Sequence, residues 1–170
     1  MKRLTILVVP LSAVGHVNAC VGTTLPLLKR GHRVVFFLDE TYRGKVKDKG
    51  FEEYIFTLET QKNEEHGPNP AKALAEQLLE YKIIGPSSPK EKLESINKYM
   101  DSDSNCEVIL QTNKFFKKAV EEIKPDCFVV DFGYLPPEIF VTKKPWVYLV
   151  SSAPLYYLDD EDAPPAGLGK

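Results

Sequence analysis

The sequence lacks the features that mark disulfide-rich, zinc-binding and nucleic-acid-binding proteins. It has only three cysteines, with no CxxC pair and no histidine at metal-ligand spacing: Cys20, Cys106 and Cys127. A disulfide framework or a zinc site is therefore disfavoured, and we interpret the cysteines as reduced thiols. The 22 lysines and arginines are scattered among 24 acidic residues, giving a net charge of −2. This distribution lacks the basic patch that binding to nucleic-acid phosphates requires.

The sequence also has no long apolar run. A membrane-spanning helix needs ~20 consecutive apolar residues, and none of the runs approaches that length. Residues 1–10 resemble the basic and apolar regions of a signal peptide, but the apolar run is short and leads directly into a strand-loop-helix pattern. We therefore expect no integral membrane segment and a cytoplasmic location.

Short β-branched runs alternate with amphipathic segments along the chain. This alternation is typical of a parallel sheet that is covered by helices on both faces. The sequence therefore predicts an α/β fold with a doubly wound, Rossmann-like parallel sheet in the strand order 3-2-1-4-5. The five expected strands comprise residues 4–9, 33–38, 51–57, 126–130 and 146–150.

The helical patterns divide into a frame and an insertion. The first helix should run from after His16 to about residue 30, with Pro26 kinking it or ending it early. A short helix is expected over residues 41–49, and a longer amphipathic one ends before Pro125. The polar stretch 58–104 carries helical patterns at 71–81 and 92–99 and is predicted to be a helical insertion in a domain spanning residues 1–158. Residues 159–170 carry no helix or strand signal and are expected to begin a loop or linker toward a second, absent domain.

Two residues stand where an open parallel sheet binds its ligands. In the order 3-2-1-4-5 the crevice lies beyond the carboxyl ends of strands one and four. His16 follows the first strand and Asp131 closes the fourth. A neutral imidazole can take a proton from a hydroxyl group, and a carboxylate on its other nitrogen fixes the tautomer. The structural alternative stays open: His16 could simply begin a helix while Asp131 caps the turn that follows it.

Other chemistries have weaker support. Asp39 and Glu40 end the second strand, where a NAD-binding unit carries a ribose-binding acid, but the first turn contains only Gly15 and no GxGxxG loop. Asp39 and Glu40 are therefore better interpreted as solvated residues that cap the next helix. His32 and His66 have no partner at useful spacing and are expected to be solvated. Ser12, Ser151 and Ser152 lack the context of a nucleophile elbow.

Four segments, in this order, carry a resemblance to a known family. They are Gly15-His16-Val17-Asn18, residues 27–34 (LLKRGHRV), residues 125–131 (PDCFVVD) and residues 145–154 (PWVYLVSSAP). With them the sequence resembles the UDP-glycosyltransferases of glycosyltransferase family 1, specifically the N-terminal half of their GT-B fold. One departure is Ala19, where many relatives have a proline directly after the Gly-His-Val-Asn motif.

The resemblance implies an inverting transfer of sugar from a UDP-sugar to a hydroxyl group of a lipophilic small molecule. It implies that His16 is the general base and that Asp131 orients it. UDP is held mostly by a C-terminal donor domain in that family. We therefore expect no cofactor on this domain, a UDP-sugar donor only for the complete enzyme, and no catalysis by this part alone. The acceptor pocket is expected to be lined by Val14, Gly15, Tyr134, Leu135, Tyr156 and Tyr157.

A second interpretation comes from a different functional class. The chain could be a non-catalytic domain that binds small lipophilic ligands, or a standalone subunit of a split glycosyltransferase. A second Rossmann-like domain encoded beyond residue 170 would favour the enzyme, whereas a natural stop there would favour the alternative.

Overall fold

A computed structural model describes residues 2–58, 70–100, 102–131 and 135–151. The chain divides into two units, one formed by Met1–Glu59 with Gln111–Ser151 and the other by Thr60–Leu110 with Ser152–Lys170. The first unit contains the sheet, and the described part of the second is helical.

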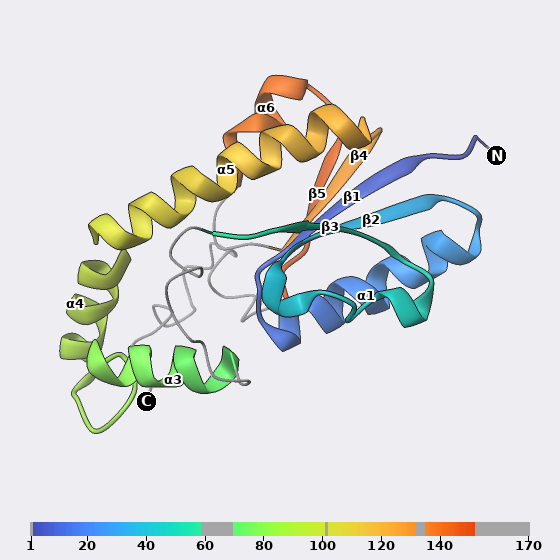
Figure 1. The fold of residues 1–170 in the computed structure, drawn as a ribbon. Helices are drawn as coiled ribbons and strands as arrows, with labels where there is room; N and C mark the ends of the chain where they lie inside the picture. Colours follow the sequence, from blue (N-terminus) through green and yellow to red (C-terminus); the bar gives the residue numbers. More distant parts are fainter. Residues whose placement is uncertain (1, 59–69, 101, 132–134, 152–170) are drawn as a thin grey trace, which may run out of the picture. The chain divides into compact units, whose positions relative to one another are not determined.

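The sheet has five parallel strands in the order β3-β2-β1-β4-β5 (Figure 1). This arrangement confirms the predicted fold class and strand order. The strands are β1 (Thr5–Pro10), β2 (Arg33–Asp39), β3 (Glu52–Phe56), β4 (Cys127–Asp131) and β5 (Trp146–Tyr148). Strand β1 lies at the centre of the sheet, with Val8 opposite Phe36 of β2 and Val129 of β4.

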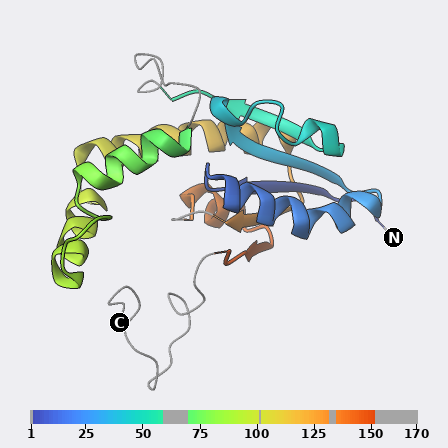
Figure 2. The ribbon, with the colours of Figure 1, turned by 90° about the horizontal axis from the view of Figure 1, so that it is seen from below.

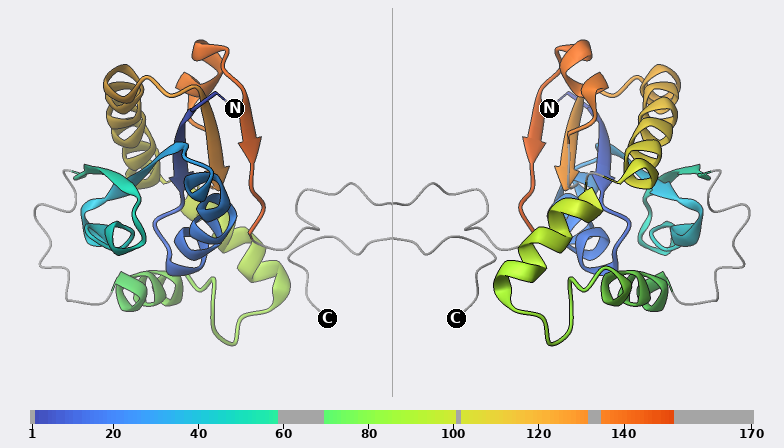
Figure 3. Two further views of the ribbon diagram at one scale, coloured as in Figure 1. Left: turned by 90° about the vertical axis from the view of Figure 1, so that its right-hand side faces the viewer. Right: turned by 90° about the vertical axis from the view of Figure 1, so that its left-hand side faces the viewer.

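Helices cover both faces of the sheet. Helix α1 (Val14–Lys29) packs on one face, and residues 111–123 of α5 (Asp103–Ile123) pack on the other (Figures 1 and 3). Between β2 and β3 lie two 3-10 turns, η1 (Glu40–Tyr42) and η2 (Lys47–Lys49). Helix α6 (Pro137–Thr142) connects β4 to β5.

Alternating strand residues build two separate apolar layers. On the α1 side, Val8 and Phe36 belong to a buried cluster with Val17 and Cys20 of the helix. On the α5 side, Phe116 lies edge-on to Phe37, with ring centroids 5.4 Å apart, and 5.9 Å from Phe128. Because the central strands are buried on both faces, their sequences are continuous apolar runs and do not alternate between apolar and polar residues.

Two local predictions were wrong, and one alternative of a third is ruled out. Helix α1 begins at Val14, so His16 lies inside its first turn and not before it. Of the two effects expected of Pro26, an early end is ruled out: the helix continues to Lys29, because a proline removes only its own amide donor and the Pro26 carbonyl still accepts from Arg30 N–H. The single helix expected over residues 41–49 is two 3-10 turns, since Gly44 between them adopts a φ of +82° that ends helical winding.

The described part of the second unit consists of helices and the turns between them. Helices α3 (Pro70–Glu80) and α4 (Pro89–Met100) correspond to the predicted helical stretches, and the first residues of α5 follow them (Figure 2). Ser88 and Glu91 form a capping box at the start of α4: Ser88 N–H donates to Glu91 Oε2 at 2.8 Å, and Glu91 N–H donates to Ser88 Oγ at 3.4 Å. Tyr81 lies edge-on to Tyr99, with ring centroids 5.0 Å apart.

Candidate active site

The candidate site lies at the carboxyl ends of β1 and β4. Pro10, the last residue of β1, is paired in register with Asp131, the last residue of β4. Leu11 N–H then donates to the Asp131 carbonyl at 2.6 Å, which holds the start of the connecting loop against β4. The loop is short, and α1 begins at Val14. The short loop after β1 thereby brings the first turn of α1, which carries His16, close to Asp131.

The structure brings His16 and Asp131 into contact. His16 Nδ1 lies 3.1 Å from Asp131 Oδ2. The Asp131 side chain is only 5% exposed, whereas the His16 side chain is 25% exposed. The imidazole therefore has an open edge beside a buried carboxylate. His16 also lies in the first turn of a helix, near where the structural alternative expected it, but that alternative does not account for this contact.

Ser151 is a further side chain at the imidazole. Its Oγ lies 2.9 Å from the same Nδ1 atom of His16, with hydrogen-bond geometry. Asp131 Oδ2 is close to Nδ1, yet it is buried and has no aligned hydrogen bond in the described part of the chain. Ser151 is therefore the nearer and better aligned partner of Nδ1, and Asp131 is the charged one. In the sequence, Ser151 was weighed as a nucleophile and not as a partner of His16. The one signal for this contact was its position just after the fifth strand, at the same edge of the sheet.

Cys20 is a buried thiol near enough to Asp131 to sense its charge. It lies one helical turn after His16 and is fully buried in the core. Burial, and to a lesser extent the charge of Asp131, raises the pKa of the Cys20 thiol to about 12. At neutral pH the thiol is therefore protonated, so it adds no second negative charge and no competing nucleophile near Asp131.

The residues predicted to line the acceptor pocket have different outcomes. Val14 is 59% exposed in the first turn of α1, and Gly15 is exposed with open space where a side chain would point. Leu135 is half-buried before α6. The remaining three, Tyr134, Tyr156 and Tyr157, lie outside the described residues. Lining of an acceptor pocket by these residues stays a prediction.

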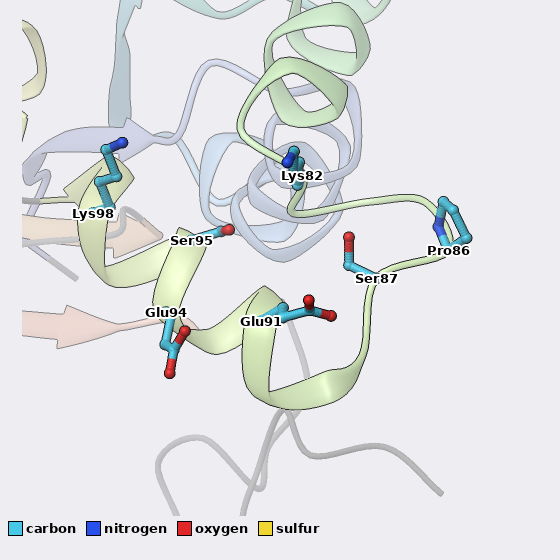
Figure 4. Close-up of a pocket in the computed structure, with 7 residues that line it drawn as sticks. All are labelled: Lys82, Pro86, Ser87, Glu91, Glu94, Ser95 and Lys98. Carbon is cyan, nitrogen blue, oxygen red and sulfur yellow. The ribbon is translucent and has the colours of Figure 1, made fainter.

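A pocket of about 530 Å³ lies in the second unit and contains none of the predicted site residues. Its lining comes from the turn after α3 and from α4: Lys82, Pro86, Ser87, Glu91, Glu94, Ser95 and Lys98 (Figure 4). Two lysines are matched by two glutamates, so this pocket has no net charge to select an anion or a cation.

Two residues that were predicted to be solvated are buried. His32 packs against the start of β1, where its Nδ1 accepts a hydrogen bond from Leu4 N–H at 3.1 Å. Asp39 is buried as well, and its Oδ1 accepts from Thr41 N–H at 2.8 Å. The predicted capping role of Asp39 is therefore confirmed, whereas its predicted exposure is wrong because strand β2 ends inside the core. His66 lies outside the described residues.

The described residues lack both a metal-binding cluster and a membrane-spanning helix. In that part of the chain, no cluster of three or more His, Cys, Asp or Glu side chains could hold a metal ion. Within the same ranges, no helix has the length and apolar character needed to cross a membrane.

The fold is shared with known glycosyltransferases. No protein-family model and no curated protein matches the sequence. Among solved structures, the glycosyltransferase SsfS6 from Streptomyces sp. SF2575 matches with a TM-score of 0.56 and 19% identity, over 86% of this chain and 39% of that one. The glycotransferase of kitacinnamycin matches with a TM-score of 0.52 and 18% identity, over 87% of this chain and 30% of that one.

Identities this low establish similarity of fold only. The chain spans well under half the length of either structure. It therefore has the five-stranded, all-parallel α/β fold of one Rossmann-like part of GT-B glycosyltransferases.

Proposed function

We propose that this chain is the N-terminal, acceptor-binding half of an inverting, UDP-sugar-dependent glycosyltransferase. Its substrates would be hydroxyl groups of lipophilic small molecules. The observation that carries the proposal is the contact of 3.1 Å between His16 Nδ1 and Asp131 Oδ2. This contact lies at the edge of the sheet where such folds bind ligands, and the fold is one that glycosyltransferases share.

In the proposed mechanism, His16 acts as the general base. A proton on Nδ1, near the carboxylate of Asp131, leaves the lone pair on Nε2 free to accept the proton of the acceptor hydroxyl. The buried carboxylate of Asp131 then stabilises the imidazolium that forms, without taking the proton itself. The partial exposure of His16 allows an acceptor to reach the imidazole, while the burial of Asp131 keeps water from screening the pair.

In the transfer step, one bond forms, one bond breaks and one proton moves, with no change of oxidation state. The acceptor oxygen forms a bond to the anomeric carbon of the sugar as His16 removes its proton. The bond between that carbon and the phosphate oxygen breaks, and UDP departs with the electron pair. Attack opposite to the leaving group inverts the configuration. A donor domain elsewhere in the full-length protein would hold UDP and stabilise its charge.

Exposed surface in the helical turn that carries His16 supports a lipophilic acceptor. Val14 is exposed in this turn, and Gly15 has open space where a side chain would point. Ligand pockets are mostly apolar with a few polar groups that fix orientation, and this combination fits that rule. The acceptor would place its hydroxyl at Nε2 of His16.

An assay of the full-length gene product tests the proposal. The protein is incubated with UDP-sugars and a panel of lipophilic alcohols and phenols, and both free UDP and glycoside mass are measured. We expect UDP release that depends on the acceptor, together with a product that has gained one sugar. If members of the panel bind but no UDP-sugar yields a glycoside, the non-catalytic ligand-binding alternative replaces the enzyme.

A further inference from the structure

Ser151 carries an inference that reaches beyond the predicted pair of His16 and Asp131. We propose that Ser151 is a positioning residue, whose Oγ accepts the Nδ1 hydrogen of His16 and thereby sets the direction of the ring. The consequence for catalysis depends on the proposed function. The hydrogen bond and the tautomer do not depend on it.

The contact distances identify Ser151 as the aligned partner of the imidazole. Nδ1 lies 2.9 Å from Ser151 Oγ and 3.1 Å from Asp131 Oδ2. Only the serine contact has hydrogen-bond geometry, and Asp131 Oδ2 has no aligned donor among the described residues. A ring nitrogen has one in-plane direction for its hydrogen, so the orientation seen here is set by Ser151.

The neighbouring carboxylate decides which way this hydrogen bond runs. The hydroxyl group of serine can donate or accept, so the serine contact alone fits either tautomer. A lone pair on Nδ1 would face the anionic oxygen of Asp131 at 3.1 Å, which is repulsive in a partly buried site. An N–H at that position faces two acceptors instead. Nδ1 is therefore protonated, Ser151 Oγ accepts, and Nε2 carries the lone pair.

The two acceptors would then have separate tasks. Asp131 is buried and charged, so it stabilises the imidazolium once the proton has been taken. Ser151 is exposed and neutral, so it fixes the ring direction while contributing little to charge stabilisation. This arrangement keeps Nε2 directed outward before any acceptor binds.

The sheet anchors the serine at this position. Leu149 N–H donates to the Val130 carbonyl at 2.7 Å, which continues the pairing of β5 with β4 beyond Tyr148. Ser151 therefore leaves the sheet beside the end of β4, where Asp131 lies. The imidazole of His16 thus follows the carboxyl end of β1, and its two partners, Asp131 and Ser151, come from the carboxyl ends of β4 and β5, the next two strands of the sheet.

Nitrogen NMR of the imidazole tests the hydrogen bond in the 170-residue chain itself. The ring nitrogens are observed at about pH 8, above the ordinary histidine pKa of about 6.5, and are assigned with the His32→Asn and His66→Gln variants. We expect His16 to show a protonated Nδ1 and an unprotonated Nε2. Ser151→Ala should shift the Nδ1 resonance, because the hydrogen loses its aligned acceptor although Asp131 still keeps it on Nδ1. Ser151→Thr, which keeps the hydroxyl, should restore the wild-type resonance. Thr23→Ala is the control: the Thr23 hydroxyl on α1 donates to the Ala19 carbonyl, so this variant should leave the His16 resonances unchanged.

Two results would overturn the proposal: a protonated Nε2 in the wild-type chain, or identical His16 resonances in wild type and Ser151→Ala. Because Ser151 is exposed, the variant should keep the melting temperature of the wild-type chain, which separates this effect from unfolding. Activity of the full-length gene product supplies the catalytic readout. Ser151→Ala should lower kcat by about 3- to 10-fold, the usual effect of one neutral hydrogen bond, with KM for the donor unchanged and kcat restored by threonine. An inactive wild-type protein with the expected resonances would contradict the proposed function while leaving the hydrogen bond in place.

Discussion

His16 and Asp131 are far apart in the chain, yet His16 Nδ1 lies 3.1 Å from Asp131 Oδ2. The contact follows from the register of two parallel strands, because Pro10 at the end of β1 pairs with Asp131 at the end of β4. A loop held by the hydrogen bond from Leu11 N–H to the Asp131 carbonyl then leads into the helical turn that carries His16. The geometry of the pair is therefore a property of the sheet and does not require a bound ligand.

Asp131→Asn should slow the full-length enzyme while leaving its fold intact. The amide keeps the size of the side chain but removes the charge that stabilises the imidazolium, and it can favour the wrong tautomer. Combined with His16→Ala, the change should add little to the loss from His16→Ala alone, because both residues serve one proton transfer. Kinetics of the two single variants and the double variant measure this coupling. Fully multiplicative losses would mean that the two residues act separately.

The 170-residue chain should not bind UDP measurably by itself. The proposed division of labour places UDP on a donor domain, and this chain would contribute the acceptor side. Isothermal titration calorimetry at about millimolar UDP, the range of weak complexes, should give no isotherm. The full-length gene product, titrated in the same way, is the control and should bind. A one-to-one isotherm for the 170-residue chain would contradict the division.

Cys20 should make the stability of the chain fall at alkaline pH. Its pKa is raised from 9.0 to about 12 in the folded chain, first by burial and then by the charge of Asp131. Between these two values the unfolded chain has lost the thiol proton and the folded chain keeps it, so the free energy of unfolding falls as pH rises. The slope from this one group approaches about 1.4 kcal/mol per pH unit.

Denaturant unfolding of wild type and Cys20→Ala at several pH values above about 8 isolates this term, since other groups titrate equally in both proteins. The stability of wild type relative to the variant should decline as pH rises. Cys106→Ala, at an exposed cysteine, is the control and should run parallel to wild type. Parallel curves for Cys20→Ala as well would show that Cys20 is not held protonated by the fold.

Phe116 should be one of the most costly residues to truncate. It lies on α5 and is fully buried where this helix packs on the sheet, in contact with Phe37 and Phe128. Phe116→Ala should lower the free energy of unfolding by about 3–5 kcal/mol, because truncation leaves a cavity as well as losing apolar burial. Phe140→Ala is the matched control: its ring is 54% exposed and contacts Trp146 only edge-on, so about 1.5 kcal/mol or less should be lost. Equal losses in the two variants would contradict the assigned core.

The sequence predicted the parts of the molecule that follow from periodicity and topology. The five strands, their order and the meeting of His16 with Asp131 follow from the alternation of short β-branched runs with helical segments and from the rule for ligand sites in parallel sheets. The start of α1 was placed too late because Ala13 offers no capping side chain to mark it. The burial of His32 was missed because its partner, Leu4 N–H, is distant in the chain and belongs to the backbone. Ser151 was missed for a similar reason, since its hydrogen bond to His16 depends on tertiary placement and leaves no local pattern.

The most direct test of the account is the turnover of His16→Ala in the full-length gene product, measured on an aliphatic alcohol acceptor. Removing the general base should lower kcat by about 10²–10⁴-fold, with little change in donor affinity. Activated phenols should lose less, because their hydroxyl protons are already acidic. If wild type and His16→Ala turn over an aliphatic alcohol equally, with product release excluded as the slow step, His16 is not the base and the account is wrong.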